Sequence, residues 1–139
     1  MKQYSNNYCQ ISYNPSTNQL YLKWLLPPDE AALLCGYDKG LDMAISNQAV
    51  SWVTDNSIGF QVDLSMQHAL TQMVAGRIKQ TAIKRFARVT PIDVFQELVT
   101  HKIISQINEL TVNCIESEVF HDPKDAKAWG TLVSLLSVN

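Results

Sequence analysis

The chain contains few cysteines, and their spacing excludes the common cysteine-based sites. Cys9, Cys35 and Cys114 are far apart and odd in number, and no C-x-x-C pair is present. Neither a zinc site nor a thioredoxin-like redox centre is therefore supported. We expect reduced, structural thiols, as in an intracellular protein.

Long apolar runs are also missing. The first eight residues contain no apolar core of a signal peptide, and no run of about 18 apolar residues exists to span a bilayer. These absences predict a soluble, cytoplasmic protein with no membrane span.

Charge of either sign is scarce. Charged residues make up 17% of the 139 residues, and the formal net charge is −2 at pH 7. No global field therefore favours specific binding to nucleic acid or to an anionic membrane. The low charged fraction instead favours self-association, and hydrophobic residues, at 46%, suffice for the core of one domain. We predict a single domain over residues 1–139, with a second copy (a homodimer) or another protein as its partner.

Motifs typical of known enzymes are absent as well. There is no Walker motif, no G-x-G-x-x-G and no G-x-S-x-G. His68, His101 and His121 are widely separated, and no two have the i, i+4 spacing of metal ligands. We therefore assign no catalytic residue, no metal ligand and no cofactor, and an enzyme is the last of three functional hypotheses.

What the chain does contain is a regular alternation of strands and amphipathic helices. The predicted strands span residues 8–13, 19–26, 49–56, 82–89 and 113–120. The order ββαβαβαβα with short connections predicts an α/β fold whose five-stranded sheet is mostly parallel and is built by right-handed crossovers. The first two strands flank a turn and form an antiparallel hairpin, while residues 1–7 are expected to form a loose tail.

Capping residues mark the helix starts. The clearest start lies after the fourth strand, where Thr90 is predicted as the cap and Pro91 as the first helical residue. The inner face of this helix should carry the apolar residues that step by three or four, which are Ile92, Phe95, Val99, Ile103 and Ile107. In the first helix, Gly36 and Gly40 either weaken the helix, by ~1 kcal/mol each relative to Ala, or let it pack closely on the sheet.

This pattern resembles a known family over nearly the whole chain. The matching stretches are residues 21–24, 52–56, 83–89, 119–122 and 126–129, which read Tyr-Leu-Lys-Trp, Trp-Val-Thr-Asp-Asn, Ile-Lys-Arg-Phe-Ala-Arg-Val, Val-Phe-His-Asp and Ala-Lys-Ala-Trp. They resemble the SpoIIAA-like, or STAS-type, superfamily, in particular its small stand-alone bacterial members of unknown role. The resemblance implies strands in sequential order with helices wound around the sheet.

The resemblance also implies a class of function. The best-known members, the anti-sigma-factor antagonists, are protein-interaction switches with a phosphorylatable Ser in an Asp-Ser-Ser-Gly-type motif at the start of a helix. The nearest match is residues 63–66, where Asp63 and Ser65 fit but the middle Ser and the Gly are missing. Related folds bind lipids or nucleotides, which implies a small ligand as the alternative.

Polar residues directly after a buried strand form the first candidate site. Asp55 and Asn56 end the third predicted strand and Ser57 follows it, and parallel sheets bind ligands just outside the carboxyl ends of their strands. Thr90, with Asp93, should lie at the mouth of the neighbouring strand and join them. The alternative is a strand-ending turn, because Asp, Asn and Ser bond readily to their own backbone.

Ser65 is the second candidate, as a phosphoacceptor. A phosphate at a helix N-terminus is favoured by the free N–H groups and by the helix dipole. The alternative, which we favour, is that Asp63 or Ser65 is simply the helix cap.

Five cations fall within twelve residues: Arg77, Lys79, Lys84, Arg85 and Arg88. Such a cluster is usually a solvated face paired with acids such as Glu116 and Glu118, and it lacks the aromatic platform that reads nucleic acid.

We therefore predict a non-catalytic regulatory or protein-interaction module. The first alternative is a carrier of a small apolar ligand, with a pocket between the sheet and the first two helices.

Overall fold

The elements alternate along the chain as the sequence predicts, with one additional strand. The computed structural model describes residues 2–137, and the side chains of residues 2–132. The strands are β1 (Gln3–Ser5), β2 (Cys9–Asn14), β3 (Gln19–Trp24), β4 (Ser51–Asp55), β5 (Arg85–Val89) and β6 (Glu116–Phe120). The helices are α1 (Glu30–Asn47), α2 (Leu64–Ala75), α3 (Val94–Thr111) and α4 (Pro123–Ser137), with a 3₁₀ turn at Ile78–Gln80.

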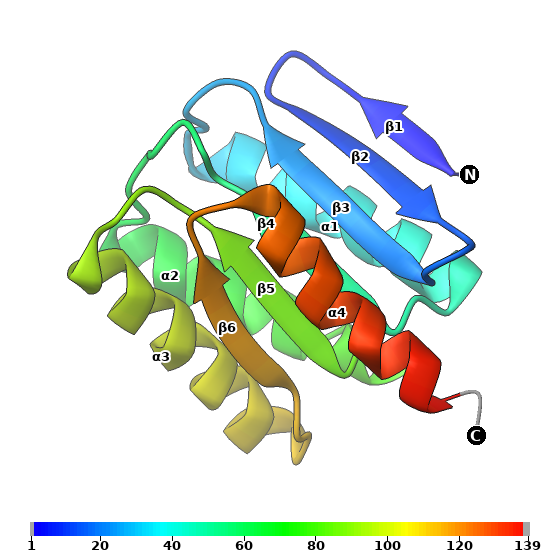
Figure 1. The fold of residues 1–139 in the computed structure, drawn as a ribbon. Coiled ribbons are helices and arrows are strands. Elements are labelled where there is room, and N and C mark those ends of the chain that lie inside the picture. Colours follow the sequence, from blue (N-terminus) through cyan, green and yellow to red (C-terminus); the bar gives the residue numbers. More distant parts are fainter. Residues whose placement is uncertain (1, 138–139) are drawn as a thin grey trace.

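All six strands form one mixed sheet in the order β1-β2-β3-β4-β5-β6. The first three strands are antiparallel, and β3 to β6 are parallel. Helices α1, α2 and α3 lie side by side on one face of this sheet, whereas α4 crosses the opposite face (Figure 1). The predicted α/β class, the hairpin and the parallel strands are therefore confirmed. None of the described helices is long and apolar enough to cross a membrane.

The prediction of five strands after a loose tail was wrong at the N-terminus. Residues Gln3–Ser5 pair with β2, with Tyr4 opposite Ile11. The reversal is held by Asn6, whose side-chain oxygen accepts from the amides of Tyr8 and Cys9 at 2.8 and 2.9 Å. A three-residue strand is too short to show a period, so its pairing is visible only in the fold.

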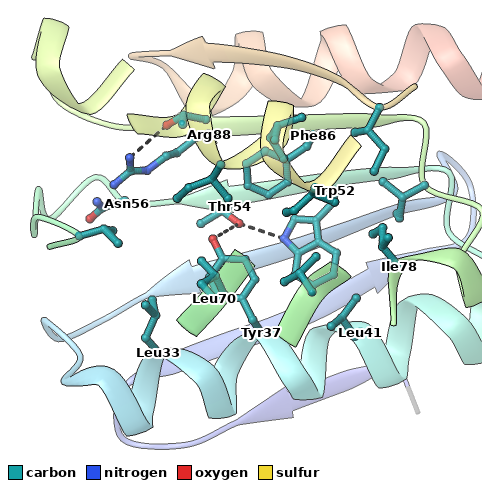
Figure 2. Close-up of a pocket in the computed structure, with 18 of the residues that line it drawn as sticks. Leu33, Tyr37, Leu41, Trp52, Thr54, Asn56, Leu70, Ile78, Phe86 and Arg88 are labelled. Atoms are coloured by element: carbon teal, nitrogen blue, oxygen red, sulfur yellow. Dashed lines mark hydrogen bonds between the residues drawn. The ribbon is translucent and has the colours of Figure 1, made fainter. Parts of the chain in front are cut away.

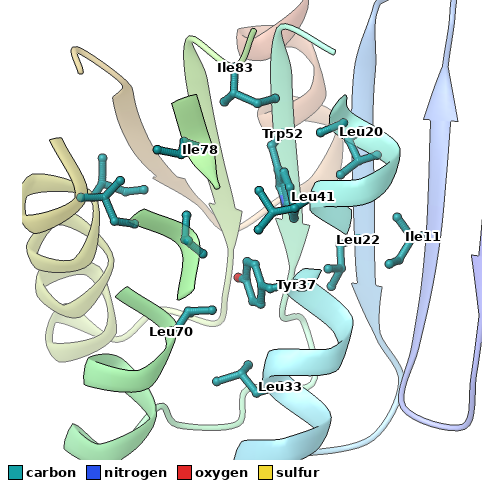
Figure 3. Close-up of a cluster of buried hydrophobic side chains, with 14 of the residues drawn as sticks. Ile11, Leu20, Leu22, Leu33, Tyr37, Leu41, Trp52, Leu70, Ile78 and Ile83 are labelled. Carbon is teal, nitrogen blue, oxygen red and sulfur yellow. The ribbon is translucent and has the colours of Figure 1, made fainter. Parts of the chain in front are cut away.

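The larger core lies between the sheet and the three-helix layer. Figure 3 shows its centre, where Tyr37 and Leu41 of α1 face Trp52 of β4 and Leu22 of β3. A smaller cluster on the other face packs Val53, Ala87 and Val89 of the sheet against Ala126 of α4. The central strands are thus buried on both faces, as parallel sheets require.

Helix α3 starts later than the sequence predicts. Thr90 does not cap it, because its backbone N–H continues the sheet by donating to Phe120 O at 3.0 Å. The cap is Asp93, which accepts from the amides of Phe95 and Gln96 at 3.0 and 3.3 Å. The predicted inner stripe is therefore wrong at Ile92 and Phe95, which are 83% and 61% exposed. The buried face instead carries Gln96, Val99, Thr100, Ile104, Ile107 and Thr111.

Candidate functional site

A cavity of about 60 Å³ lies between the sheet and the helical layer. Its floor is formed by β4 and β5, and its walls by α1, α2 and α3. Figure 2 shows that the cavity has two chemically different ends. Leu41 and Ile78 lie at one end, whereas Arg88 and Asn56 lie at the other, next to the carboxyl ends of the strands. For the carrier alternative the sequence predicts a pocket between the sheet and the first two helices, and this cavity extends beneath α3 as well.

Strand register places the polar groups of this cavity. In β4 and β5, Trp52 pairs with Phe86 and Thr54 pairs with Arg88. Because side chains alternate along a strand, these four residues share the face beneath the helices, and all four line the cavity. On β5, the apolar Phe86 therefore lies beside Trp52, and the charged Arg88 lies beside Thr54.

A hydrogen-bonded triad of side chains spans the middle of the cavity. Trp52 Nε1 donates to Thr54 Oγ1 at 2.9 Å, and the Tyr37 hydroxyl donates to the same oxygen at 3.2 Å. The rings of Tyr37 and Trp52 are stacked, with centroids 5.7 Å apart. Burial raises the pKa of Tyr37, which outweighs the opposing effects of Thr54 and Arg88. Tyr37 therefore stays a neutral hydroxyl at physiological pH.

Arg88 brings a charge into this layer. Its side chain is buried, with the residue 5% exposed. Nη1 donates to the carbonyl oxygen of Gln96 at 3.3 Å and to Thr100 Oγ1 at 3.1 Å, and Nη2 donates to Gln96 Oε1 at 3.1 Å. Burial lowers the pKa of Arg88, against smaller raising effects of Tyr37 and Asp93. Guanidinium remains protonated in proteins, so the site holds a cation.

Asn56 organises the loop beside the polar end. Its side chain is fully buried, and its Oδ1 accepts from the amides of Gly59 and Phe60 at 3.1 and 3.2 Å. Its Nδ2 donates to the carbonyl oxygen of Phe60 at 2.9 Å. Gly59 takes a φ of 81°, which suits glycine. Asn56 thus both lines the cavity and shapes the loop over it.

Asp55 and Ser57, predicted to join Asn56, lie on the other face of the sheet. Asp55 is 3% exposed and accepts hydrogen bonds from the Tyr21 hydroxyl, the Ser57 hydroxyl and, at 2.9 Å, the Ser57 amide. Burial, followed by the bond to Asp55, raises the pKa of Tyr21. The ammonium of Lys127 from α4 lies 4.3 Å from the Tyr21 ring centre. These contacts form a closed network at the end of β4.

Thr90, which the sequence predicts beside Asp55 and Asn56, lies at the end of β5. Thr90 lies at the same end of the sheet as Asn56, since Asn56 N donates to Val89 O at 2.7 Å. Thr90 is 2% exposed, and its carbonyl oxygen is 2.9 Å from Nδ1 of His121. The two turns that the sequence predicts at one edge of the sheet therefore do meet there, although Thr90 does not line the cavity.

Asp63 and Ser65 lie at the start of α2. Asp63 is the helix cap and accepts from Met66 N at 2.9 Å. Ser65 is exposed, and its hydroxyl donates to Glu30 Oε1 of α1 at 2.6 Å. A phosphate on Ser65 would face that carboxylate, and like charges repel.

The key residue that sequence reasoning missed is Arg88. It was grouped with four other cations, which the fold separates: Arg77 pairs with Asp38 and Asp42 at 2.6 and 2.7 Å, and Arg85 turns toward α4. Of the acids expected to pair with the cluster, Glu116 lies 3.8 Å from Arg85. The available signal was the period of two in β5, which places Arg88 on the face of Phe86.

Comparisons of this chain with models of protein families, with curated proteins and with solved structures gave no match.

Proposed function

We propose that this chain is a non-catalytic module that binds a small, mostly apolar molecule in the cavity beneath α1, α2 and α3. The observation that carries the proposal is the two-ended cavity, with aliphatic and aromatic walls and a few polar groups at one end. Binding sites for small molecules have this composition, since apolar walls supply affinity and a few polar groups fix the orientation. The described residues that line the cavity include no carboxylate, histidine or cysteine, which supports binding rather than catalysis.

Titration with 1-butanol tests this proposal. Two of the three tryptophans, Trp24 and Trp52, line the cavity, so a bound molecule should change the fluorescence of the chain and raise its melting temperature. In a Leu70→Phe variant the larger ring should occupy the cavity and abolish both effects. Leu98→Phe is the matched control, because Leu98 is 63% exposed and should leave both effects intact. Equal responses of all three proteins would contradict the proposal.

A second function, recognition of a protein partner, is favoured by an apolar rim at the carboxyl edge of the sheet. We define this rim as Leu26, Ile58, Leu64, Ile92 and Phe95, which are 45–83% exposed. They follow the carboxyl ends of β3, β4 and β5, and clustered exposed apolar side chains mark interaction surfaces. The SpoIIAA-like resemblance, with its interaction switches, agrees with this role, and we retain that fold assignment and the homodimer as parts of the proposal.

Sedimentation velocity measures the self-association part of this second function. The wild type should sediment as a dimer that a Phe95→Ser variant weakens, while Leu110→Ser, at the far end of α3, serves as the control. A strict monomer that also recovers no partner in pull-downs would contradict this second function.

Mass spectrometry of protein from its native cell tests whether Ser65 is a phosphoacceptor. An unmodified Ser65 in all growth states would contradict phosphorylation at this residue.

A further inference from the structure

The buried guanidinium of Arg88 makes no ion pair with a carboxylate among the described residues. All of its hydrogen bonds there go to neutral oxygens of Gln96 and Thr100, and none of the ion pairs within residues 2–132 includes it. Asp93 is an acidic residue that acts on it from a distance, but the hydrogen bonds that Asp93 accepts from Phe95 and Gln96 serve the cap of α3. A buried charge without a partner costs several kcal/mol, so its presence here needs an explanation.

Arg88 also has hydrogen-bond donors to spare. A guanidinium carries five N–H groups, and the contacts within the described part of the chain use two on Nη1 and one on Nη2. One Nη2–H and the Nε–H are left for an acceptor outside those contacts. A carboxylate binds two parallel N–H groups of one guanidinium at once.

Two other buried side chains in the described part of the chain also hold donors without acceptors. Gln96 Nε2 and Trp24 Nε1 are buried without a hydrogen-bond partner among the described residues. The amide of Gln96 is oriented by its Oε1, which accepts from Arg88, so Nε2 remains the donor. Thr54 Oγ1 accepts from both Trp52 and Tyr37, which leaves its own proton to donate. Thr54 and Trp24 line the cavity, and Gln96 contacts Arg88. The surroundings of the cavity therefore have an excess of donors, which suits a ligand rich in acceptor oxygens.

The size of the cavity restricts that ligand. One water-sized sphere takes roughly 10–15 Å³ of such space, so a cavity of about 60 Å³ holds on the order of five non-hydrogen atoms. The end opposite Arg88 is lined by Leu41 and Ile78. An aliphatic tail fits these walls, whereas a multiply charged group would meet only one cation.

We propose, building on the ligand-binding function above, that the cavity takes a short-chain monocarboxylate. Its carboxylate pairs with the free N–H groups of Arg88 at the polar end. Its alkyl tail lies along Trp52 toward Ile78. This assignment gives the buried cation an ion-pair partner and gives the free N–H groups of Arg88 their acceptors.

Calorimetric titration with butyrate and with butyramide, its neutral amide, tests the assignment. The wild type should bind butyrate at least ten-fold more tightly than butyramide, and butylamine should not bind. Arg88→Met should abolish the preference for butyrate. Arg85→Met is the matched control, because Arg85 is on the same strand but bonds to the carbonyl oxygen of Trp129 on the α4 face; it should keep the preference.

A measurement on the wild type keeps the test independent of how the variants fold. The Nε–H resonance of Arg88 should shift on addition of butyrate and stay in place with butyramide. Equal affinity for butyrate and butyramide would overturn the carboxylate assignment while leaving the proposed ligand-binding function standing. Failure of butyrate, butyramide and 1-butanol alike to bind would overturn both.

Discussion

At the scale of single residues, Arg88 shows a conflict between stability and binding. A cation buried among neutral oxygens lowers the stability of the fold, and binding sites often retain such groups at that cost. We therefore expect Arg88→Met, which keeps a long side chain without the charge, to raise the free energy of unfolding by about 1–3 kcal/mol in urea titrations. Arg85→Met should not stabilise, since Arg85 stacks on Trp129 at 4.5 Å. A less stable Arg88→Met would show that the guanidinium is a net structural contributor.

Asn56 acts through the loop rather than through an ion pair. Its amide satisfies three backbone groups of residues 59 and 60, and each buried backbone group without a partner costs about 1–3 kcal/mol. Asn56→Ala should therefore lower the free energy of unfolding by about 2–4 kcal/mol in thermal or urea denaturation. Ser57→Ala, an exposed neighbour, should change it much less. Similar losses in the two variants would show that the loop is not held by Asn56.

The residue patterns predicted where the polar residues lie in the fold better than they predicted which contacts those residues make. The turn after β4 was expected beside the turn after β5, and the pairing of Asp55 with Val89 places both at one edge. However, Asp55 and Asn56, which are adjacent in sequence, point to opposite faces and bond to different partners. The role of a polar side chain depends on the partners that other helices and strands place next to it. Arg88, for example, donates to Gln96 and Thr100 of α3. Local sequence does not contain that information.

At the scale of elements, α1 shows how glycine sets the distance between a helix and a sheet. A Cβ on Gly40 would lie 2.5 Å from Cη2 of Trp52, and one on Gly36 would lie 2.6 Å from Cη2 of Trp24. The expectation that these glycines permit close packing is therefore confirmed. The approach also positions Tyr37, between them in the helix, against Trp52.

The Gly40→Ala variant tests this close approach. Alanine favours a helix by about 1 kcal/mol over glycine, but the added methyl group should force Trp52 to move, and overpacking costs about 1–3 kcal/mol. We expect a net loss of stability in urea denaturation and a change in tryptophan fluorescence. Gly76→Ala is the control, because its Cβ would meet only ordinary contacts at 3.5 Å. A Gly40→Ala variant as stable as Gly76→Ala would show that α1 and Trp52 can move apart enough to accommodate the methyl group.

Helix α3 shows why helix boundaries and faces were harder to predict than helix existence. Both Thr90 and Asp93 have side chains suited to capping, and the choice between them depends on the bond from Thr90 to Phe120 in a distant strand. The inner face carries Gln96 and Thr100, which apolar periodicity cannot select. The apolar residues left outside, such as Phe95, became part of the rim.

At the scale of the whole molecule, three buried groups predict sensitivity to alkaline pH. Burial, with a smaller effect of Cys35, raises the pKa of Cys9 to about 11 from an ordinary value of 9.0, and burial also raises the pKa of Tyr21 and Tyr37. Each group holds its proton more tightly in the folded chain than in the unfolded chain. The free energy of unfolding should therefore be undiminished below pH 9 and fall as the pH rises toward 11.

Urea denaturation at pH 8.5 and pH 10.5 measures this effect. We expect a loss of at least about 1 kcal/mol between the two values. Cys9→Ala should be less stable at pH 8.5 because it leaves a small cavity, but its loss on going to pH 10.5 should be smaller. Stability that is unchanged across this interval would contradict the role of the buried groups.

The overall architecture was more predictable than any site in it. Alternating strands and helices with short connections leave few topologies, because right-handed crossovers dictate where each parallel strand goes. The cavity between the layers depends on how closely each helix approaches the sheet, and thus on Gly36, Gly40 and the rotation of α3. These distances arise from the packing of elements far apart in sequence.

The order of the strands has a consequence for whether copies of this chain can join through their sheets. A sheet that ends in β1 on one side and β6 on the other offers two open margins onto which a neighbour's strand could be added. The outer strand β6 carries exposed Glu116 and Glu118, so a second β6 laid against it would bring negative charges together. The edge strand on the other side, β1, is only three residues long, so it has few backbone groups with which another strand could pair. We therefore expect both outer strands to disfavour the addition of a strand from another copy.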